Sequence, residues 1–560
     1  MKTDISRRSF LKGTAAAAAG AALASTPVMA DELLIAPAPE AAEAKHPWEI
    51  PPEPVAEADI KGTIETEVLI IGGGYSGCAA AASSAERGVQ VILVEQNDAL
   101  TGHGVGGTGS VGSKIIDELG GNEAMGLDKP YSVVQWLRAC ANRARESLVA
   151  KFFNESHRAM DWLIDLALAD GGNVYLSACN SRSRHYPEQP AYHMVTGLQS
   201  SADLGWAAMS VGVPILLKKD AEEHGAQFDF KTKALYLEKD GDRVVGAICE
   251  KEDGYYRYKA SLGVVLATGD ISGDDEMTEY FAPIANKVYS KLYTPVGSNT
   301  GSGHKMGLWA GGSFQDGPWP CMLHPQACAG FHGPFLFVSP EGKRFMDEAT
   351  WVQGKCLGVM LQAKAKYAWS IFDGHWKEDL LDSLPHGGGM FWDNFRMWGT
   401  SEQDAVDAFA RQVEGAGNGT GTDGRNYFQA DTLEELAKLI EVPEEEFLAS
   451  VARYNEMCEA GEDVDFYKEP TFLYPIKEPP YHAAKVGPAL LVIVGGLNIS
   501  DNFEVLTPED KPIPGLYATG NCSGNLYASD YPINIPGNSH GRCLTWGFLL
   551  GEQFEAMKKA

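Results

Sequence analysis

Short apolar runs that lead directly into glycine or polar residues are the most regular pattern along this chain. Residues 67–71 (EVLII) run straight into a glycine cluster at 72–77, which an alanine-rich stretch follows up to Arg87. A short run of this kind predicts a buried strand, and the alanine-rich stretch predicts a helix. Apolar runs at 89–94 and 264–267 predict further strands. The pattern therefore predicts a strand, a glycine turn, a helix and a second strand, the start of an α/β sheet.

The glycine cluster has a nucleotide-binding spacing. Gly72 permits a tight turn, Gly74 lets the backbone approach a pyrophosphate, and Gly77 allows the helix to pack closely. The N-terminus of that helix favours negative charge. Glu95 comes 23 residues after Gly72, where an acid can bind ribose hydroxyls. These residues predict a dinucleotide site, the alternative being a glycine-rich structural turn. A second glycine cluster at 101–110 would run along the rest of a longer cofactor.

The first 30 residues read as a targeting segment. Adjacent Arg7 and Arg8 precede a weakly apolar, alanine-rich run at 14–24 and small residues around Ala30. This looks like a twin-arginine signal peptide, the alternative being a disordered leader. We expect export to the periplasm or another extracytoplasmic space. Residues 31–62 are rich in Ala, Pro and Glu and predict a linker, and no later run predicts an integral membrane segment.

Composition narrows the function classes. The chain has 560 residues, of which 44% are hydrophobic, so it can form more than one folded core. It carries 75 Asp and Glu against 46 Lys and Arg, a formal charge of -29, which argues against nucleic acid as a partner. Its ten cysteines form no CxxC or CxxCH motif, so we expect no attached haem, no iron–sulfur centre and no metal site.

Landmarks along the chain resemble one flavoprotein superfamily, which contains soluble fumarate reductases, the succinate dehydrogenase flavoprotein subunit and 3-ketosteroid dehydrogenases. The matching strings are the glycine fingerprint, Ala267-Thr268-Gly269, residues 299–306, His324-Pro325, Gly342-Lys343-Arg344-Phe345, Asp431-Thr432-Leu433, Arg453-Tyr454-Asn455, Pro479-Pro480-Tyr481 and residues 515–521. The resemblance implies an α/β, Rossmann-like FAD-binding domain in two parts, 63–315 and 488–560. An α+β capping domain for the substrate, 316–487, would be inserted between them.

The resemblance also implies FAD as the cofactor and assigns residues to it. A final helix opening at 537–539 should direct its N-terminal amides at the flavin edge where negative charge grows on reduction. The expected cofactor contacts are Gly72, Gly74, Tyr75, Ser76, Gly77, Glu95, Gln96, Gly102, His103, Gly107, Thr108, Gly109, Thr268, Gly269, Gly520, Asn521, Gly537, Asn538 and Ser539.

His103 has two interpretations. It occupies the position at which succinate dehydrogenase flavoproteins attach FAD covalently to histidine, whereas soluble relatives carry Asn there. It could equally be a polar residue beside a non-covalently bound cofactor.

The substrate positions depart from the fumarate reductase pattern. Val352 stands where those enzymes have the proton-donating Arg, Val492 where they have a substrate-binding His, and Asn534 near the carboxylate-binding Arg. Only His324 of the expected set remains. A small dicarboxylate needs cationic groups at both ends, so fumarate and succinate are improbable substrates. Val352 and Trp351 instead favour a larger, more apolar ligand.

Candidate catalytic residues come from the C-terminal segment. In ketosteroid dehydrogenases a Tyr just before a Pro-Gly turn polarises the substrate carbonyl. Tyr531 is the candidate for that role, with an insertion of about two residues against the pattern, and Tyr527 could serve instead. His324 or His540 could assist with proton transfer. Arg542 could bind a substrate carboxylate or only form an ion pair on its helix, and Arg344 is expected to form a structural ion pair.

These residues lead to one main hypothesis: an exported FAD-dependent reductase that saturates a C=C bond conjugated to a carbonyl or carboxylate, by hydride transfer from flavin N5. The substrate would be an enone, an enoate or a steroid-like molecule. Without a haem of its own, such an enzyme would take electrons from a separate cytochrome or a quinone-linked protein, as in respiration. The alternatives are a ketosteroid-like dehydrogenase working in the desaturating direction and a non-catalytic flavin electron carrier.

Overall fold

The computed structural model describes residues 46–102, 107–177, 189–292, 297–330, 332–386, 397, 399–416 and 426–560. By their contacts, residues 51–560 form one unit and residues up to Ile50 another. The expected signal peptide and His103 lie outside the described residues. None of the helices in the described ranges is long and apolar enough to cross a membrane.

An eight-stranded sheet forms the centre of the larger unit, with the strands in the order β17-β18-β9-β1-β2-β6 and the hairpin β7–β8 joined to β9. Strands β18, β9, β1, β2 and β6 run parallel. This confirms the α/β fold class, and the predicted strands 67–71, 89–94 and 264–267 fall on β1, β2 and β9. The strands are β1 (Ile60–Ile71), β2 (Val91–Val94), β6 (Gln227–Asp229), β7 (Lys233–Asp240), β8 (Arg243–Lys251), β9 (Gly254–Leu266), β17 (Glu504–Leu506) and β18 (Pro512–Ala518).

The first strand begins earlier than the sequence suggests. It starts at Ile60, and the turn before it is attached to the sheet, because Arg257 donates hydrogen bonds of 2.7 and 2.8 Å to Glu57. The backbone N–H of Val55 also donates to the hydroxyl of Tyr236 over 2.9 Å. The last residues of the segment expected to be a linker, 31–62, therefore belong to the folded unit.

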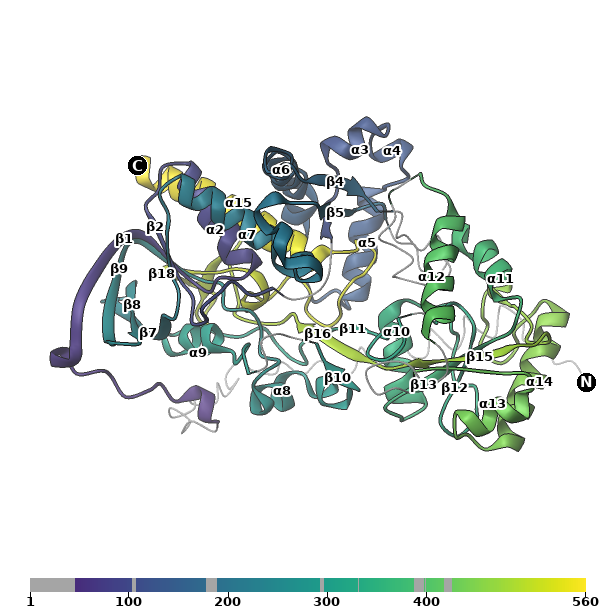
Figure 1. Ribbon diagram of the computed structural model, residues 1–560. Helices are drawn as coiled ribbons and strands as arrows, with labels where there is room; N and C mark the ends of the chain where they lie inside the picture. The colour runs from purple at the N-terminus through teal and green to yellow at the C-terminus, as the bar shows by residue number, and fades with distance from the viewer. Residues whose placement is uncertain are drawn as a thin grey trace, which may run out of the picture. The chain divides into compact units, whose positions relative to one another are not determined.

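Two helices pack together on one side of this sheet, α2 (Tyr75–Glu86) and the C-terminal α15 (Asn538–Lys559), with α7 (Ala208–Glu223) and α6 (Glu146–Ala169) beside them (Figure 1). The Ser83 hydroxyl of α2 donates to the backbone carbonyl of Phe548 over 2.8 Å. Because α2 and α15 come from opposite ends of the chain, their contact joins the first and last parts of the unit on this side of the sheet.

Smaller elements surround the carboxyl ends of the parallel strands. One is a three-stranded sheet in the order β3-β5-β4. These strands and the neighbouring helices are β3 (Thr108–Gly109), β4 (Asn173–Leu176), β5 (Tyr192–Thr196), α3 (Lys114–Glu118), α4 (Gly121–Ala124), α5 (Lys129–Ala139), α8 (Asp275–Phe281) and α9 (Ser302–Trp309).

A second α+β region lies within 316–487, the range expected for the capping domain. Its antiparallel sheet has the order β12-β13-β15-β14 and a hydrophobic core of its own that includes Trp369, Phe447 and Tyr454. Its elements are β12 (Leu336–Val338), β13 (Ala368–Phe372), β14 (Tyr427–Ala430), β15 (Tyr481–Val486), α10 (Val352–Leu357), α11 (Trp376–Ser383), α12 (Glu402–Ala416), α13 (Leu433–Leu439) and α14 (Glu444–Ala460).

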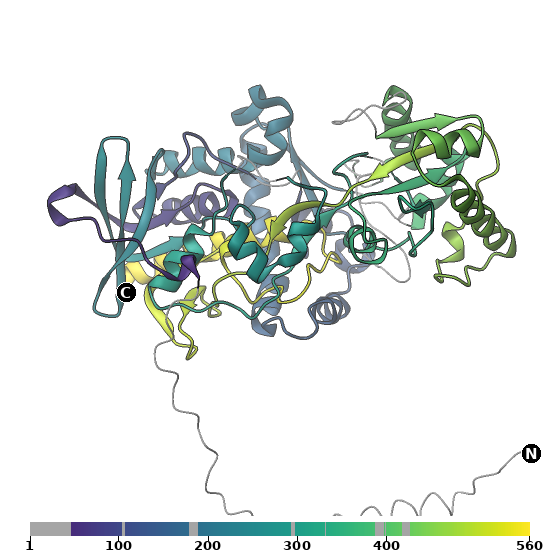
Figure 2. The same cartoon turned by 90° about the horizontal axis from the view of Figure 1, so that it is seen from below.

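A short sheet connects this region, the cap, to the rest of the unit. Strand β16 (Ala489–Ile493) pairs in parallel with β10 (Ser290–Lys291) and antiparallel with β11 (Cys321–His324). The chain enters the cap after β11 and returns along β16, so two adjacent strands form the connection. Figure 2, which views the molecule from below, shows the green cap elements joined to the rest of the unit through these strands.

The cap holds a buried ionic cluster around Glu348. Arg344 donates to both carboxylate oxygens of Glu348 over 2.8 and 2.9 Å and to Asp463 over 2.7 Å, and the Lys468 ammonium lies 3.1 Å from Glu348. Glu348 is fully buried; burial alone would raise its pKa, but the charges of Lys468 and Arg344 outweigh this effect and lower it. The cluster confirms the structural ion pair expected for Arg344.

Replacing Glu348 by Gln should destabilise the protein by about 3–5 kcal/mol, because Arg344 and Lys468 would remain buried without their shared anion. Urea unfolding at neutral pH measures the loss. Since the folded-state pKa of Glu348 is lowered, its contribution is present above the ordinary Glu value of 4.5 and decreases as the pH falls. The difference between wild type and E348Q should therefore shrink in acid.

The matched control is Glu446→Gln. Glu446 forms an ion pair of 3.6 Å with Lys343 on the same domain, and both side chains are half exposed. Such pairs contribute less than about 1 kcal/mol. Equal losses in the two variants would contradict the role given to the buried cluster.

Candidate active site

The glycine fingerprint forms a tight turn between β1 and α2. Gly72 has a φ of +111°, and a Cβ there would lie 2.5 Å from the carbonyl oxygen of Ala267. A Cβ on Gly77 would lie 2.0 Å from the carbonyl oxygen of Gly72, so only glycine fits. Gly74 differs, because a Cβ there would meet nothing within 4 Å. It caps α2 and faces open space, as expected of a residue whose backbone approaches a ligand.

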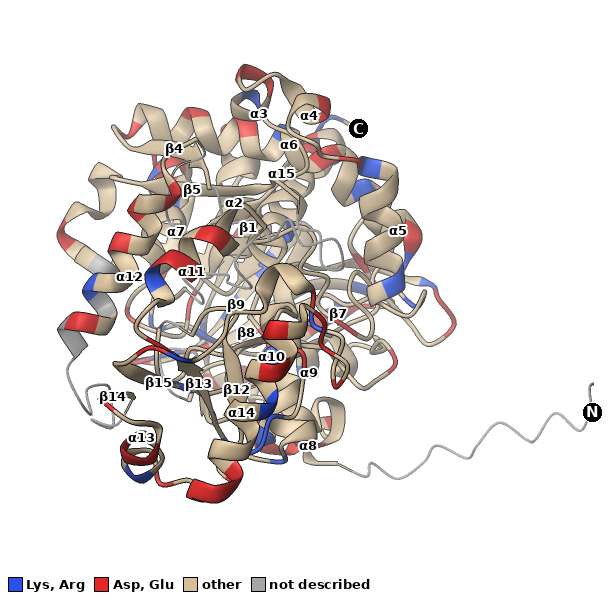
Figure 3. Ribbon diagram, turned by 90° about the vertical axis from the view of Figure 1, so that its right-hand side faces the viewer, with Lys and Arg blue, Asp and Glu red and all other residues tan. Residues whose placement is uncertain are grey.

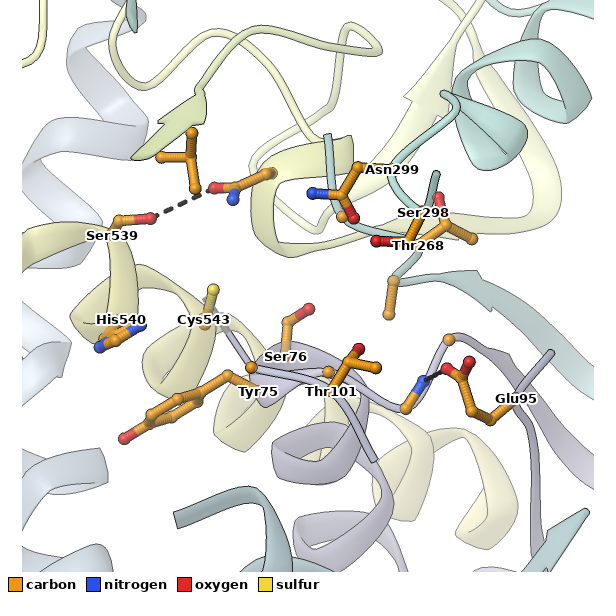
Figure 4. Close-up of a pocket in the computed structure, with 18 of the residues that line it drawn as sticks. Tyr75, Ser76, Glu95, Thr101, Thr268, Ser298, Asn299, Ser539, His540 and Cys543 are labelled. Carbon is orange, nitrogen blue, oxygen red and sulfur yellow. Dashed lines mark hydrogen bonds between the residues drawn. The ribbon is translucent and has the colours of Figure 1, made fainter. Parts of the chain in front are cut away.

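That open space is a cavity of about 1270 Å³, part of it open to solvent, at the carboxyl ends of β1, β2 and β9. Figure 4 shows side chains from α2, α15 and the turns after β2 and β9 converging on it. The predicted cofactor residues that line it are Gly72, Gly74, Tyr75, Ser76, Glu95, Gln96, Gly102, Gly107, Thr268, Gly269, Asn521, Gly537 and Ser539.

The other predicted cofactor residues lie behind this lining. Gly77 packs within the turn, and Thr108 shares a 2.7 Å hydrogen bond with the hydroxyl of Tyr75. The Gly109 N–H donates to the Gly537 carbonyl over 2.8 Å, and the Asn538 side chain donates to the Pro532 and Ile535 carbonyls. Gly520 begins a short turn with a φ of +61°. These residues therefore support the residues that line the cavity and do not line it themselves.

Glu95 is fixed at the end of β2. Its Oε2 accepts from the Gly73 N–H over 2.7 Å, and its Oε1 accepts from the backbone and side-chain nitrogens of Asn97 over 2.8 and 2.7 Å. The side chain lines the cavity and is otherwise buried. The fingerprint and the acid thus meet at one end of the cavity, the arrangement that holds a ribose next to a pyrophosphate.

The opposite end of the cavity meets the N-terminus of α15. Gly537 caps this helix with a φ of +71°, and Ser539 in its first turn shares a 3.2 Å hydrogen bond with Asn521. Exposed N–H groups and the helix dipole favour negative charge at such a terminus. Two helix N-termini, of α2 and α15, therefore face one elongated cavity.

Beside α15 the cavity wall changes to aromatic, aliphatic and imidazole side chains. These residues are Tyr192, Met322, His324, Leu491, Val492, Tyr531 and His540. Burial lowers the pKa of His324 to about 3, so its imidazole is neutral at working pH. His540 stacks on Tyr75 at 5.0 Å, and its Nδ1 lies 3.3 Å from the Gly107 carbonyl.

The Tyr531 hydroxyl is held by the start of α15. Its oxygen accepts a 3.0 Å hydrogen bond from the Ser539 N–H. Because a backbone N–H can only donate, the hydrogen of the hydroxyl stays available for another acceptor. The ring is buried, and burial raises the pKa of this phenol above its ordinary value, which keeps the hydroxyl protonated.

Residues 67–533 match the family described as the FAD binding domain. The chain belongs to this family. FAD is its cofactor, and the glycine turn, Glu95 and the two helix termini fit that cofactor's pyrophosphate, ribose and flavin. Residues 4–24 match the twin-arginine translocation pathway signal sequence, which confirms the predicted export signal.

Several relatives of this FAD-binding protein are named as reductases, and one is named as a dehydrogenase. The vinyl phenol reductase of Lactiplantibacillus plantarum is 23% identical over 511 residues, covering 87% of this chain and 94% of the relative. The digoxin reductase of Eggerthella lenta is 24% identical over 603 residues, covering 100% of this chain and 98% of the relative. The chain is an FAD-dependent oxidoreductase.

Two solved structures share the fold. An open flavocytochrome c3 fumarate reductase aligns with a TM-score of 0.62 and 22% identity, covering 92% of this chain and 82% of that one. The 3-ketosteroid-Δ4-(5α)-dehydrogenase of Rhodococcus jostii RHA1 aligns with a TM-score of 0.64 and 21% identity, covering 88% and 97%. Two of the three superfamily branches expected from the sequence are thus represented among the structural neighbours of the FAD-binding protein.

Four of the expected catalytic or substrate residues do not line the cavity, and two of them, Arg542 and Tyr527, are buried in the C-terminal part of the chain. Arg542 is fully buried, with Nη1 donating to the Ser523 carbonyl over 3.3 Å and Nη2 to the side chain of Asn521. Its guanidinium lies over the Tyr527 ring, 4.8 Å from the centroid. The substrate role of Arg542 and the catalytic role of Tyr527 stay predictions; in the structure Arg542 contacts Asn521, and the Tyr527 ring stacks on Tyr531 at 5.3 Å.

The cap provides an apolar wall next to the cavity. Val352, at the start of α10, packs with Tyr192, Met194 and Ile533, and Trp351 packs against this cluster. Tyr192 also lines the cavity. The expected apolar surface is thus present in the flavoprotein, one layer behind the lining. Sequence reasoning did not identify Tyr192, because it lies in no motif.

Asp270 is another residue that the motifs did not single out. It follows the Thr268-Gly269 turn, and its Oδ1 accepts hydrogen bonds from Asn299 over 2.7 Å and Ser272 over 2.8 Å. Its Oδ2 accepts from the Ile493 N–H on β16. Its position directly after a parallel strand was the available signal, since side chains at those ends build the sites of α/β sheets.

Two alanine substitutions in the fingerprint should separate FAD binding from folding. Gly74→Ala adds a methyl that meets no protein atom within 4 Å and projects into the cavity expected to hold FAD. We expect apoprotein of unchanged thermal stability with a lower ratio of flavin absorbance to protein. Gly77→Ala places a methyl 2.0 Å from the Gly72 carbonyl oxygen, so it should lower the melting temperature with or without FAD. Wild-type flavin content in G74A would show that the cofactor does not approach this turn.

Proposed function

We propose that this protein is an exported reductase that saturates a C=C bond conjugated to a carbonyl or carboxylate in a fairly large or apolar organic substrate. The observation that carries the proposal is the Tyr531 hydroxyl, held at the cavity wall by the Ser539 N–H with its own hydrogen available. Such a hydrogen fits the oxygen of a substrate carbonyl, where charge grows during reduction of the conjugated bond.

The residues around Tyr531 support this chemistry. Bound FAD supplies the hydride, from N5 of its reduced form. The Tyr531 hydroxyl would donate a hydrogen bond to the substrate oxygen. His324 is neutral, so it can orient the substrate through an N–H group but cannot supply a proton as an imidazolium. The Ser539 N–H in turn strengthens the phenol as a donor, because a bond accepted by its oxygen polarises the hydroxyl.

The substrate class follows from the charges at this end. The described lining beside Tyr531 contains no Lys or Arg. Val492 stands where fumarate reductases have a substrate-binding His, and Asn534, whose amide donates to the Ser132 carbonyl over 3.0 Å, stands near their carboxylate-binding Arg. A small dicarboxylate would lack partners there. The apolar cluster around Val352 favours a larger hydrocarbon surface. Relatives named for vinyl phenol and digoxin agree with neutral substrates.

Export from the cytoplasm determines which donors can supply the electrons that reduce the flavin. The twin-arginine signal directs the folded flavoprotein out of the cytoplasm, and we place it in the periplasm or an equivalent space. Its electrons would come from a separate cytochrome or quinone-linked protein in a respiratory chain. Acidic side chains outnumber basic ones on the cap helices α11–α14 (Figure 3), which would steer a basic donor.

The reaction is tested with purified holoprotein and reduced viologen under anaerobic conditions. Enones, enoates and steroids are added in turn, and reoxidation of the flavin is followed. Failure of every acceptor would overturn the proposal. Rapid flavin reduction by a saturated ketosteroid, with no turnover of the enones, would establish the desaturating direction instead.

Tyr531→Phe should lower kcat for the accepted substrate about 100- to 1,000-fold, the range for loss of one donor to a developing oxyanion, with unchanged FAD content. Tyr527→Phe is the matched control. Its ring stacks on Tyr531 at 5.3 Å, but its hydroxyl is buried without a hydrogen-bond partner among the described residues. Turnover of Y527F should stay close to wild type, and similar rates for Y531F and wild type would remove Tyr531 from the mechanism.

A further inference from the structure

Arg542 of α15 is a buried cation without a counter-ion in the part of the chain that the structure describes. Its side chain is 0% exposed. One Nη nitrogen donates to the Ser523 carbonyl over 3.3 Å, the other donates to the side-chain oxygen of Asn521, and Nε is buried with no partner among the described atoms. Both acceptors are neutral. Because an arginine guanidinium keeps its charge in proteins, a full positive charge is enclosed here.

Arg344 in the cap shows how this chain holds a buried guanidinium elsewhere. Its side chain is 6% exposed and pairs with the carboxylates of Glu348 and Asp463 over 2.8 and 2.7 Å. A buried charge without such a partner is costly and persists only where something offsets the cost. Arg542 has no carboxylate partner among the described residues, so its position indicates a role outside the ion pairs that hold the fold.

The titratable side chains that interact with the Arg542 charge in the described structure are neutral as well. Burial raises the pKa of all four, so two thiols and two phenols stay protonated. They are Cys522, Tyr527, Tyr531 and Cys543. The Tyr527 ring centroid lies 4.8 Å from the guanidinium carbon and offers only the weak attraction of its π face. These neighbours therefore leave the positive field of Arg542 uncancelled, in surroundings of low dielectric constant.

The charge lies directly behind the cavity wall at the start of α15. Asn521, which accepts the hydrogen bond from Arg542, lines the cavity, and so does Cys543, the next residue of the helix. Asn521 also shares a 3.2 Å hydrogen bond with Ser539 in the first turn of α15. Figure 4 shows Ser539 and Cys543 on this wall. Asn521 therefore joins the buried cation to the helix terminus at the end of the cavity expected to hold the flavin.

Reduction of the cofactor creates the anion that this wall lacks. Two-electron reduction of FAD with uptake of one proton leaves one negative charge on the flavin, and charges near the ring tune how readily it is reduced. The N-terminus of α15 favours that negative charge. A cation behind the same wall acts in the same direction. Because it favours the reduced form over the oxidised form, its effect is a higher reduction potential.

We propose that Arg542 is kept as an unpaired buried cation to stabilise the negative charge of the reduced flavin, and that it raises the reduction potential of bound FAD by acting through Asn521. It is a positioning residue, because it contacts a residue of the lining and does not line the cavity itself. The role holds whichever acceptor the enzyme reduces. In the exported reductase proposed above, a raised potential would let the flavin take electrons from a cytochrome or quinone-linked donor.

The first test measures the reduction potential of FAD in purified holoprotein. Wild type, Arg542→Gln and Arg542→Met are reduced slowly by viologen under anaerobic conditions with a reference dye, and the reduced fractions of dye and flavin are compared. Both substitutions remove the charge. We expect the equilibrium constant for flavin reduction to fall about tenfold or more, which lowers the potential of this two-electron couple by about 30 mV. Equal potentials in wild type and R542Q would overturn the proposal.

Two controls separate the charge from the structure. Arg542→Lys keeps the positive charge without the planar fork, so the equilibrium constant should stay within about threefold of wild type. Arg243→Gln removes a comparable guanidinium, since Arg243 on β8 donates to the carbonyls of Ser261 and Leu262 over 3.1 and 2.7 Å and does not line the cavity. R243Q should leave the potential unchanged. A fall as large in R542K as in R542Q would show that the contact with Asn521 matters and the charge does not.

Sulfite gives a second measurement, independent of electron transfer. It adds through its sulfur to N5 of the oxidised flavin and leaves a negative charge on the ring, as reduction does. R542Q should therefore bind sulfite about 10-fold more weakly than wild type, measured by the loss of flavin absorbance. Wild-type holoprotein that forms no adduct would contradict the proposal even if no variant could be purified with FAD.

The remaining outcome concerns cofactor binding. Folded R542Q and R542M that bind no FAD, beside R542K that does, would assign the charge to holding the cofactor and would overturn its role in the reduction potential. None of these measurements uses an organic acceptor. Their failure is therefore distinct from failure of the proposed function, which the acceptor panel tests.

Discussion

The structure depends on a close approach of backbones where two helices begin. Gly77 of α2 lies against the Gly72 carbonyl, and Gly541 of α15 lies against the Gly109 carbonyl, each so close that a Cβ would be 2.0 Å from the oxygen. These contacts bring helices from opposite ends of the chain to the same edge of the parallel sheet. Their N-termini then face one cavity, and an anionic cofactor can extend between two sites that both favour negative charge.

Much of the FAD end could be predicted because local backbone geometry decides it. A tight turn with a positive φ at Gly72 and a close contact at Gly77 both require glycine, so the requirement is visible in the sequence. Glu95 could be located for a similar reason, since it follows a short apolar strand by one residue. The cofactor residues that turned out to lie behind the lining, such as Gly109, still appear in the same motifs because they hold the lining in place.

The substrate end could be predicted less well because it combines segments distant in sequence. Tyr527 and Tyr531 are four residues apart and chemically identical, and only the path of the chain shows that Tyr531 reaches the Ser539 N–H. Arg542 lies one turn beyond Ser539 on the same helix, yet its guanidinium points towards Asn521. Tyr192 and Gln353 belong to no motif, and their positions follow from how β5 and α10 pack against the C-terminal segment.

The two-strand connection through β11 and β16 has a consequence for the timing of events at the site. Any tilt of the cap about this connection would carry Val352 and Gln353 away together, since both lie in the first turn of α10. An opened cap would thus remove the apolar wall and break the hydrogen bond from Gln353 to Asp530 in one movement. Substrate entry and release of the segment that carries Tyr531 from the cap would then belong to the same phase of the cycle.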